Sequence, residues 1–445
     1  MSEYVRSRGK SLGLIELVAI AIGGMVGGGI FSILGISVKM VGMLTPIAIA
    51  IGGMVAALAA YSYVKLGVYY KDPGATYAFI KRTFKNSHLM ASAIGWITIF
   101  GYISTLALYS YTFASYAISG SEWAQDVWVR KGVALAVIAV FALINIWSVK
   151  GMGRIEDIMV YTKLIILAVI SVLLLQHGKM SFSDFLEQML IDARHSHLLH
   201  ILIVSSITFV AYEGFQLVIN AVNEMENPDK MIPRAIYTAI VSVILLYVII
   251  ALGALFAIPK EELIKNKEYA LAAGAREILG KFGEWLVIFS ALLATSSAIS
   301  GTIFGSSRQM AAIAEDGYFP SFLTKRRRGI PVNAILTMAG FASFLIIIGG
   351  LRLILEFGSI TFLLVSLLIA YANYVIRDKT HSSTWLTLLS IIGLGTGTIL
   401  ILYYEAKTKP EQMMFILFMY ILLGTGAYLY GKRRDRMEKE KLQKQ

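Results

Sequence analysis

The chain has 445 residues, of which 57% are hydrophobic and only 15% are charged. Soluble domains carry about 25% charged residues, so this composition excludes an ordinary water-soluble protein. A net charge of +12 can indicate a nucleic-acid partner, but here the basic residues recur in short clusters between apolar stretches. We therefore expect a protein embedded in a lipid bilayer, with no nucleic-acid partner, whose basic clusters record its orientation. The lack of cysteine excludes disulfides, thiolate metal sites and cysteine nucleophiles.

Twelve apolar stretches are long enough to cross a bilayer, which takes about 20 helical residues. All eight prolines fall at or between the ends of these stretches, so any break inside a span must come from glycine. The sequence thus predicts an all-α integral membrane protein with about 12 transmembrane helices. The predicted spans are 12–41, 45–69, 89–119, 132–149, 154–175, 199–223, 235–258, 284–313, 332–350, 353–376, 384–403 and 412–431.

The loops between the spans differ in their basic residues. If the N-terminus is cytoplasmic, the majority of the 40 Lys and Arg residues fall on the cytoplasmic side. Basic loops favour the cytoplasm, so we expect a multi-pass protein of the cell membrane with both termini inside. Residues 1–11 would then form a cytoplasmic segment, and 432–445 a basic cytoplasmic tail.

The first span contains the sequence GGMVGGGIF, with five glycines between Gly23 and Gly29. Spacings of four residues between glycines are typical of a close helix-packing stripe. However, Gly27, Gly28 and Gly29 are consecutive and cover most of the helix circumference, and each costs about 1 kcal/mol relative to alanine in a helix. The alternative is an unwound segment whose backbone binds a ligand. Both interpretations stay open from this span alone.

The sixth span carries Tyr212, Glu213 and Gly214 near the bilayer centre. A carboxylate at that depth is expensive and indicates a functional site, although a protonated structural glutamic acid is the alternative. Interrupted spans at the first and sixth positions are the pattern of two inverted five-helix repeats with a binding site between them. Tyr102, Tyr109 and Tyr116 repeat every seven residues in the third span, which indicates helix packing.

Lys163 lies about ten residues into the fifth span, too deep for its side chain to reach the interface easily. A lysine in a low-dielectric interior can take up and release a proton under physiological conditions. The alternative is a permanently charged lysine in a structural ion pair, with Glu213 as a candidate partner.

Three segments resemble the amino acid–polyamine–organocation (APC) family of transporters: GGMVGGGIF, YEGF followed by ENPDKMIPRAI, and SSAISGTIFGSSRQMAAIAEDGYFP. The resemblance covers nearly the whole chain, about 12–430. It implies a LeuT-type fold, with a ten-helix inverted-repeat core at 12–376 and two peripheral helices at 377–431. Lys163 resembles the lysine of prokaryotic proton-coupled amino acid transporters, particularly the archaeal broad-specificity type.

The resemblance also implies a substrate site between the two broken helices. The amides of Gly28 and Gly29 would bind the substrate carboxylate, and backbone carbonyls would accept its ammonium. Gly214 would leave space for the substrate side chain. The residues expected at the substrate are Met25, Gly27, Gly28, Gly29, Tyr102, Phe209, Ala211, Tyr212, Glu213 and Gly214. The residues expected at the proton-coupling site, where sodium-coupled relatives hold a sodium ion, are Lys163, Gly23, Ser296 and Ser297.

Two positions depart from the family pattern. Many members carry an acidic residue where this chain has Gln216, and a glutamate where Asn223 stands. Glu213 is outside the pattern. Its carboxylate could favour a cationic substrate or could serve in proton transfer, and the sequence leaves this open.

Together these features predict a secondary active transporter that moves amino acids by proton symport with alternating access. The alternative is an exchanger of amino acids against amines or polyamines. The sequence contains no recognisable catalytic constellation, so we expect no enzymatic activity, cofactor or metal.

Overall fold

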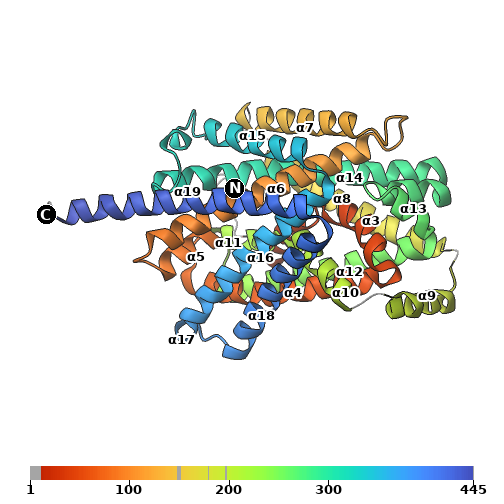
Figure 1. Ribbon diagram of the computed structural model, residues 1–445, viewed down its shortest axis with the longest axis horizontal. Helices are drawn as coiled ribbons and strands as arrows, with labels where there is room; N and C mark the ends of the chain where they lie inside the picture. The colour runs from red at the N-terminus through yellow and green to blue at the C-terminus, as the bar shows by residue number, and fades with distance from the viewer. Residues whose placement is uncertain (1–11, 148–151, 179, 196–197, 444–445) are drawn as a thin grey trace.

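The computed structural model describes residues 12–147, 152–178, 180–195 and 198–443. The predicted cytoplasmic segment 1–11 lies outside these ranges. Most of the helices run lengthwise between two ends (Figure 1). One end carries α5 (Ala75–Thr83) and the C-terminus, and the other carries α9 (Phe182–His195) and α13 (Lys260–Lys265).

Every predicted span overlaps a helix in the described residues. The helices are α2 (Leu14–Met25), α3 (Gly29–Val41), α4 (Thr45–Tyr70), α6 (His88–Ala117), α7 (Val127–Trp147), α8 (Met152–Gln176), α10 (Leu198–Thr208), α11 (Leu217–Asn220), α12 (Pro228–Ala257), α14 (Ala270–Glu315), α15 (Val332–Ile348), α16 (Leu351–Val375), α18 (Thr384–Thr408) and α19 (Pro410–Gln443). Shorter helices are η1 (Gly42–Leu44), η2 (Phe209–Tyr212), η3 (Val222–Glu224), η4 (Ser321–Thr324) and α17 (Arg377–Thr380).

Ten stretches of the described chain are long and apolar enough to cross a membrane, and α2 and α15 are shorter apolar helices. The described ranges contain isolated β-bridges but no strand. The expectation of an all-α, multi-pass membrane protein is therefore confirmed. The count of 12 spans and the inverted repeat stay predictions.

One expectation about proline is wrong. Helix α12 begins at Pro228 rather than near 235, which places Pro233 inside the helix. Pro233 lacks the N–H that would bond to the carbonyl four residues earlier. Because it lies in the second turn, most of the helix beyond it keeps an unbroken hydrogen-bond ladder.

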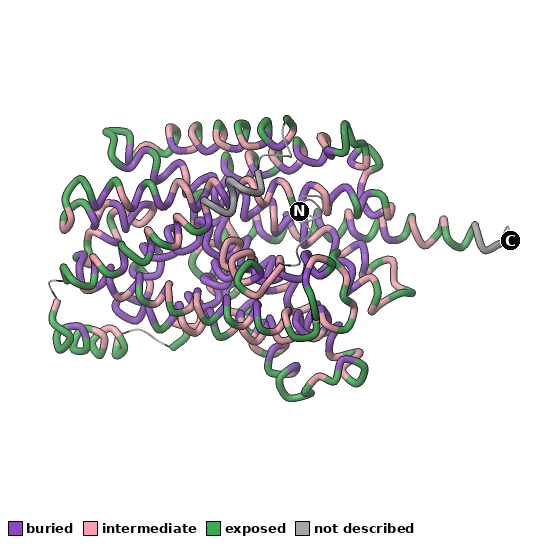
Figure 2. The backbone as a smooth tube through the Cα atoms, turned by 180° about the vertical axis from the view of Figure 1, so that it is seen from behind, coloured by how far each residue is buried: buried purple, intermediate pink, exposed green. Residues whose placement is uncertain are grey.

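Burial separates an interior from a surface that faces lipid. Buried residues gather in the middle of the bundle, and exposed ones lie on the surrounding helices and the projecting end of α19 (Figure 2). The exposed side chains of α7 and α19 include large apolar residues such as Leu143 and Ile421, which are 60% and 67% exposed. Such an apolar surface suits hydrocarbon rather than water.

The last helix is longer than its predicted span. Helix α19 has 34 residues, which corresponds to about 51 Å at 1.5 Å per residue. It therefore exceeds the hydrocarbon thickness of about 30 Å and projects from the bundle (Figure 1). The predicted basic tail from Lys432 thus begins as a continuation of this helix.

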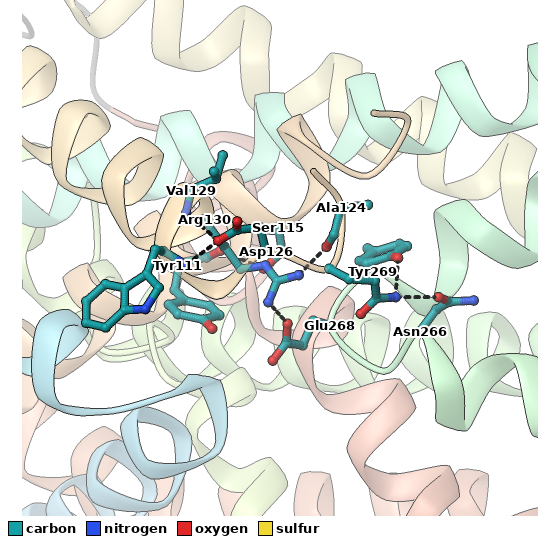
Figure 3. A network of polar contacts seen from close by, with 11 residues as sticks. Tyr111, Ser115, Ala124, Asp126, Val129, Arg130, Asn266, Glu268 and Tyr269 are labelled. Carbon is teal, nitrogen blue, oxygen red and sulfur yellow. Dashed lines mark hydrogen bonds and ion pairs between the residues drawn. The ribbon is translucent and has the colours of Figure 1, made fainter. Parts of the chain in front are cut away.

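A buried arginine at the start of α7 forms an ion pair with the segment 266–269 between α13 and α14 (Figure 3). Arg130 is 2% exposed, and its guanidinium forms an ion pair with Glu268 and donates to the carbonyl of Ala124. The same group lies over the ring of Tyr111, 5.9 Å from its centroid. The cation is thus paired and packed, as a buried charge requires.

Neighbouring contacts hold the same segment over α3. The amide of Gln125 donates to the hydroxyl of Tyr269 at 2.8 Å and to Oδ1 of Asn266 at 3.2 Å. A β-carbon on Gly35 of α3 would come within 2.4 Å of the Cα of Lys267. The segment therefore lies directly on the middle of α3, the second half of the first broken helix.

We expect Arg130→Ala to lower the stability by about 2 kcal/mol, because it leaves the partly buried Glu268 carboxylate without its cation. The measurement is the midpoint of thermal unfolding of the purified protein in detergent. Arg326→Ala is the matched control, since Arg326 and its partner Glu315 are both exposed, at 36% and 49%, and lie 3.0 Å apart. It should cost less than about 1 kcal/mol. Equal midpoints for the two variants would contradict the role of Arg130.

Candidate functional site

The first span is broken at the glycine run. Helix α2 ends at Met25, α3 begins at Gly29, and Gly27 donates its N–H back to the carbonyl of Met25 at 2.9 Å. The first amides of α3 consequently have no intrahelical acceptor, and they lie at the positive end of its dipole. Such a helix N-terminus inside the bundle can bind an anion such as a carboxylate.

The sixth span is broken at the same level of the bundle. Helix α10 ends at Thr208 and continues as the 3-10 turn η2. Glu213 is then extended, Gly214 has a φ of +129°, and helical structure resumes at Leu217. The backbone of η2 and the two residues after it therefore leaves the regular helical hydrogen-bond pattern inside the bundle.

The two breaks contact each other through backbone atoms. A β-carbon on Gly214 would lie 2.5 Å from the carbonyl carbon of Gly24 and 2.7 Å from the amide nitrogen of Met25. A β-carbon on Gly29 would lie 2.7 Å from that of Ala211. The glycines therefore allow the two broken helices to pack closely, in addition to interrupting each helix. The space that we expected beside Gly214 for a substrate side chain is filled by α2 in this structure.

Tyr247 of α12 joins the two breaks and was missed by the sequence analysis. Its hydroxyl lies 2.9 Å from the carbonyl oxygen of Met25 and 3.1 Å from that of Ala211, so it can donate to either. Met25 and Ala211 are two of the residues expected at the substrate. The available signal was a phenol in the middle of a mainly apolar span, because a buried tyrosine hydroxyl needs a partner.

Lys163 reaches the first break from α8. It is fully buried, and its Nζ donates to the carbonyl oxygen of Gly23 at 3.0 Å. Ala298 of α14 packs against Gly27, which brings the adjacent Ser297 and Ser296 to the same region. The structure thus brings Lys163 and Gly23 together, with the two serines on a neighbouring helix.

Gln216 holds the carboxylate of Glu213 in place. Its Oε1 accepts the N–H of Gly214 at 3.0 Å, and its Nε2 donates to Oε1 of Glu213. The hydroxyl of Tyr102 on α6 also interacts with the side chain of Gln216. Tyr102 is half-buried, whereas Glu213 and Gln216 are buried.

The remaining expected residues have mainly packing contacts. Tyr212 donates its hydroxyl to the carbonyl of Ile49 on α4 at 2.8 Å, and its ring centroid lies 5.4 Å from that of Tyr247. Phe209 is buried. Tyr109 lies against Gly27 and Gly28, so the tyrosine repeat of the third span packs on the broken helix, as its spacing indicates.

Comparisons with known proteins agree with this architecture. The amino acid permease family matches residues 12–427. An uncharacterised protein of Methanocaldococcus jannaschii, MJ0609, is 28% identical over 429 residues, which cover 96% of this chain and 97% of the relative. The inner membrane transport protein YbaT of Escherichia coli is 31% identical, covering 95% and 97%. Asc-type amino acid transporter 1 of Mus musculus is 27% identical, covering 76% and 65%.

We expect Gly214→Ala to destabilise the protein by at least about 2 kcal/mol, since alanine is strained at a φ of +129° and its β-carbon would clash with Gly24. Gly340→Ala in α15 is the matched control, because a β-carbon there meets nothing within 4 Å. It should leave stability unchanged or raise it by up to about 1 kcal/mol. Thermal unfolding midpoints in detergent compare the two, and an unaffected Gly214→Ala protein would show that the breaks do not pack as described.

Proposed function

We propose that this chain, which belongs to the amino acid permease family, carries amino acids across the cell membrane by symport with protons. Family membership and the similarity to a named amino acid transporter support amino acid transport rather than catalysis. The observation that carries the proton-coupled mechanism is the hydrogen bond from the buried Lys163 to Gly23, next to the first helix break.

The two breaks offer complementary groups for an amino acid. The amides of Gly28 and Gly29 would bind the carboxylate at the positive end of α3. The carbonyls of Met25 and Ala211 would bind the ammonium. The carbonyl oxygen of Met25 already accepts the N–H of Gly27, so it keeps a lone pair for substrate when Tyr247 donates its one hydroxyl proton to Ala211 instead. The zwitterion would thus lie across both broken helices.

Lys163 would couple protonation to the position of the first helix. A protonated Nζ donates to the carbonyl of Gly23 and ties α8 to α2. Loss of a proton removes the positive charge, which weakens this bond and frees α2 to move relative to α8. A proton that enters with the substrate and leaves on the other side would therefore change the contact that positions the substrate site.

The first and sixth broken helices would move as one unit. Their breaks touch at Gly214 and Gly24, and the N–H of Leu12 donates to the carbonyl of Glu224 at 2.7 Å. Rocking of this pair against the other helices would expose the site to each side in turn. With both termini in the cytoplasm, as the basic loops favour, the α13 end would face outward.

Lys163→Ala should abolish the uptake of amino acids driven by a pH gradient into proteoliposomes. Lys163→Arg should do the same, because arginine keeps the charge but does not release its proton. The measurement is radiolabelled uptake with and without an inward proton gradient.

Lys65→Ala is the control for the lysine variants, since Lys65 donates to the carbonyl of His381 near the α5 end and should be dispensable. Proton-driven uptake that survives in Lys163→Ala would refute the role of Lys163. Uptake that ignores the gradient but requires substrate on the opposite side would identify an exchanger instead.

A further inference from the structure

We propose that Glu213 forms a side-chain subsite that selects amino acids with a cationic side chain, such as arginine or lysine. The inference rests on the proposed amino acid transport and specifies its substrate class. It follows from one carboxylate oxygen that the folded chain leaves unpaired in the interior, one residue from the contact between the two breaks.

The carboxylate of Glu213 is only half satisfied. The side chain is 5% exposed, and Oε1 accepts a hydrogen bond from Gln216. Oε2 is buried and has no hydrogen-bond partner among the described residues. Buried polar atoms are nearly always paired in native proteins, so an unpaired carboxylate oxygen beside a binding site points to a ligand.

Gln216 determines which carboxylate oxygen of Glu213 has no hydrogen-bond partner. Because its amide accepts from Gly214 and donates to Glu213, the glutamine is held at both ends. The carboxylate is therefore oriented before a substrate arrives, which lowers the cost of ordering it on binding. An acidic residue in place of Gln216 could accept the Gly214 N–H but could not donate to Glu213 when ionised.

Three tyrosines have hydroxyls near this carboxylate. They are Tyr63 of α4 and Tyr102 and Tyr109 of α6. Tyrosine faces attract guanidinium and ammonium groups, and a carboxylate pairs with them through charge-assisted hydrogen bonds. The half-buried Tyr102 gives this cluster its most accessible member.

Charge also favours a cationic ligand. An ionised carboxylate in the bilayer interior is costly unless a cation or a proton offsets its charge. If a cationic group of the substrate offsets this charge, Glu213 distinguishes cationic from neutral amino acids. A carboxylate that carries only a proton would treat cationic and neutral amino acids of the same shape alike.

The test compares arginine with citrulline, its neutral isostere, on the full-length wild-type protein in lipid nanodiscs. We expect arginine to bind at least about 10-fold more tightly by calorimetry, because one charge-assisted hydrogen bond is gained. Glu213→Gln should remove this preference, so that arginine binds no more tightly than citrulline. Glu315→Gln is the control, since Glu315 is exposed and pairs with Arg326 at 3.0 Å; it should retain the preference.

The outcomes separate the subsite from the transport function. Equal binding of arginine and citrulline by wild-type protein, with alanine bound, would overturn the subsite and leave amino acid transport standing. A preference for arginine that persists in Glu213→Gln would also overturn it. A wild-type protein that binds no amino acid would refute the proposed function itself. The wild-type comparison holds even where Glu213→Gln does not fold.

Discussion

Hydrocarbon offers no hydrogen bonds, so a membrane helix can be interrupted only where protein supplies partners for the freed backbone groups. Here the two interrupted helices supply this environment together. The backbone of Gly214 rests on that of Gly24 and Met25, and Gly29 rests on Ala211. Neither break faces lipid, because each is covered by the other. The positions of the polar side chains at the site follow from this contact.

Three neighbouring helices complete the polar environment of the breaks. Tyr247 of α12 bonds to carbonyls on both sides, Lys163 of α8 bonds to Gly23, and Tyr102 of α6 interacts with Gln216. Each contact joins a moving element of the proposed cycle to the surrounding bundle. Binding, protonation and movement of the breaks are therefore expected to depend on one another.

The sequence was sufficient for features that depend on local physics. Apolar length predicted the helices, and the glycine run with Glu213 and Gly214 predicted where two of them break. Local sequence patterns did not predict features that depend on contacts between distant parts of the chain. Pro233 lies inside α12 because the helix extends over two turns before its apolar stretch. The backbone contact of Gly214 with Gly24 and Met25 is likewise set by the packing of distant helices, which spacing along the chain does not reveal.

The sequence by itself determined a multi-pass α-helical membrane protein with a glycine run in the first span and ionisable residues inside the fifth and sixth spans, since bilayer energetics act on composition and length. The family resemblance had already implied that Lys163 lies at Gly23. Only the tertiary structure brought Tyr247 to the carbonyls of Met25 and Ala211 and left Oε2 of Glu213 without a hydrogen-bond partner among the described residues. These relations depend on how helices far apart in the chain pack, and packing is set by the whole fold.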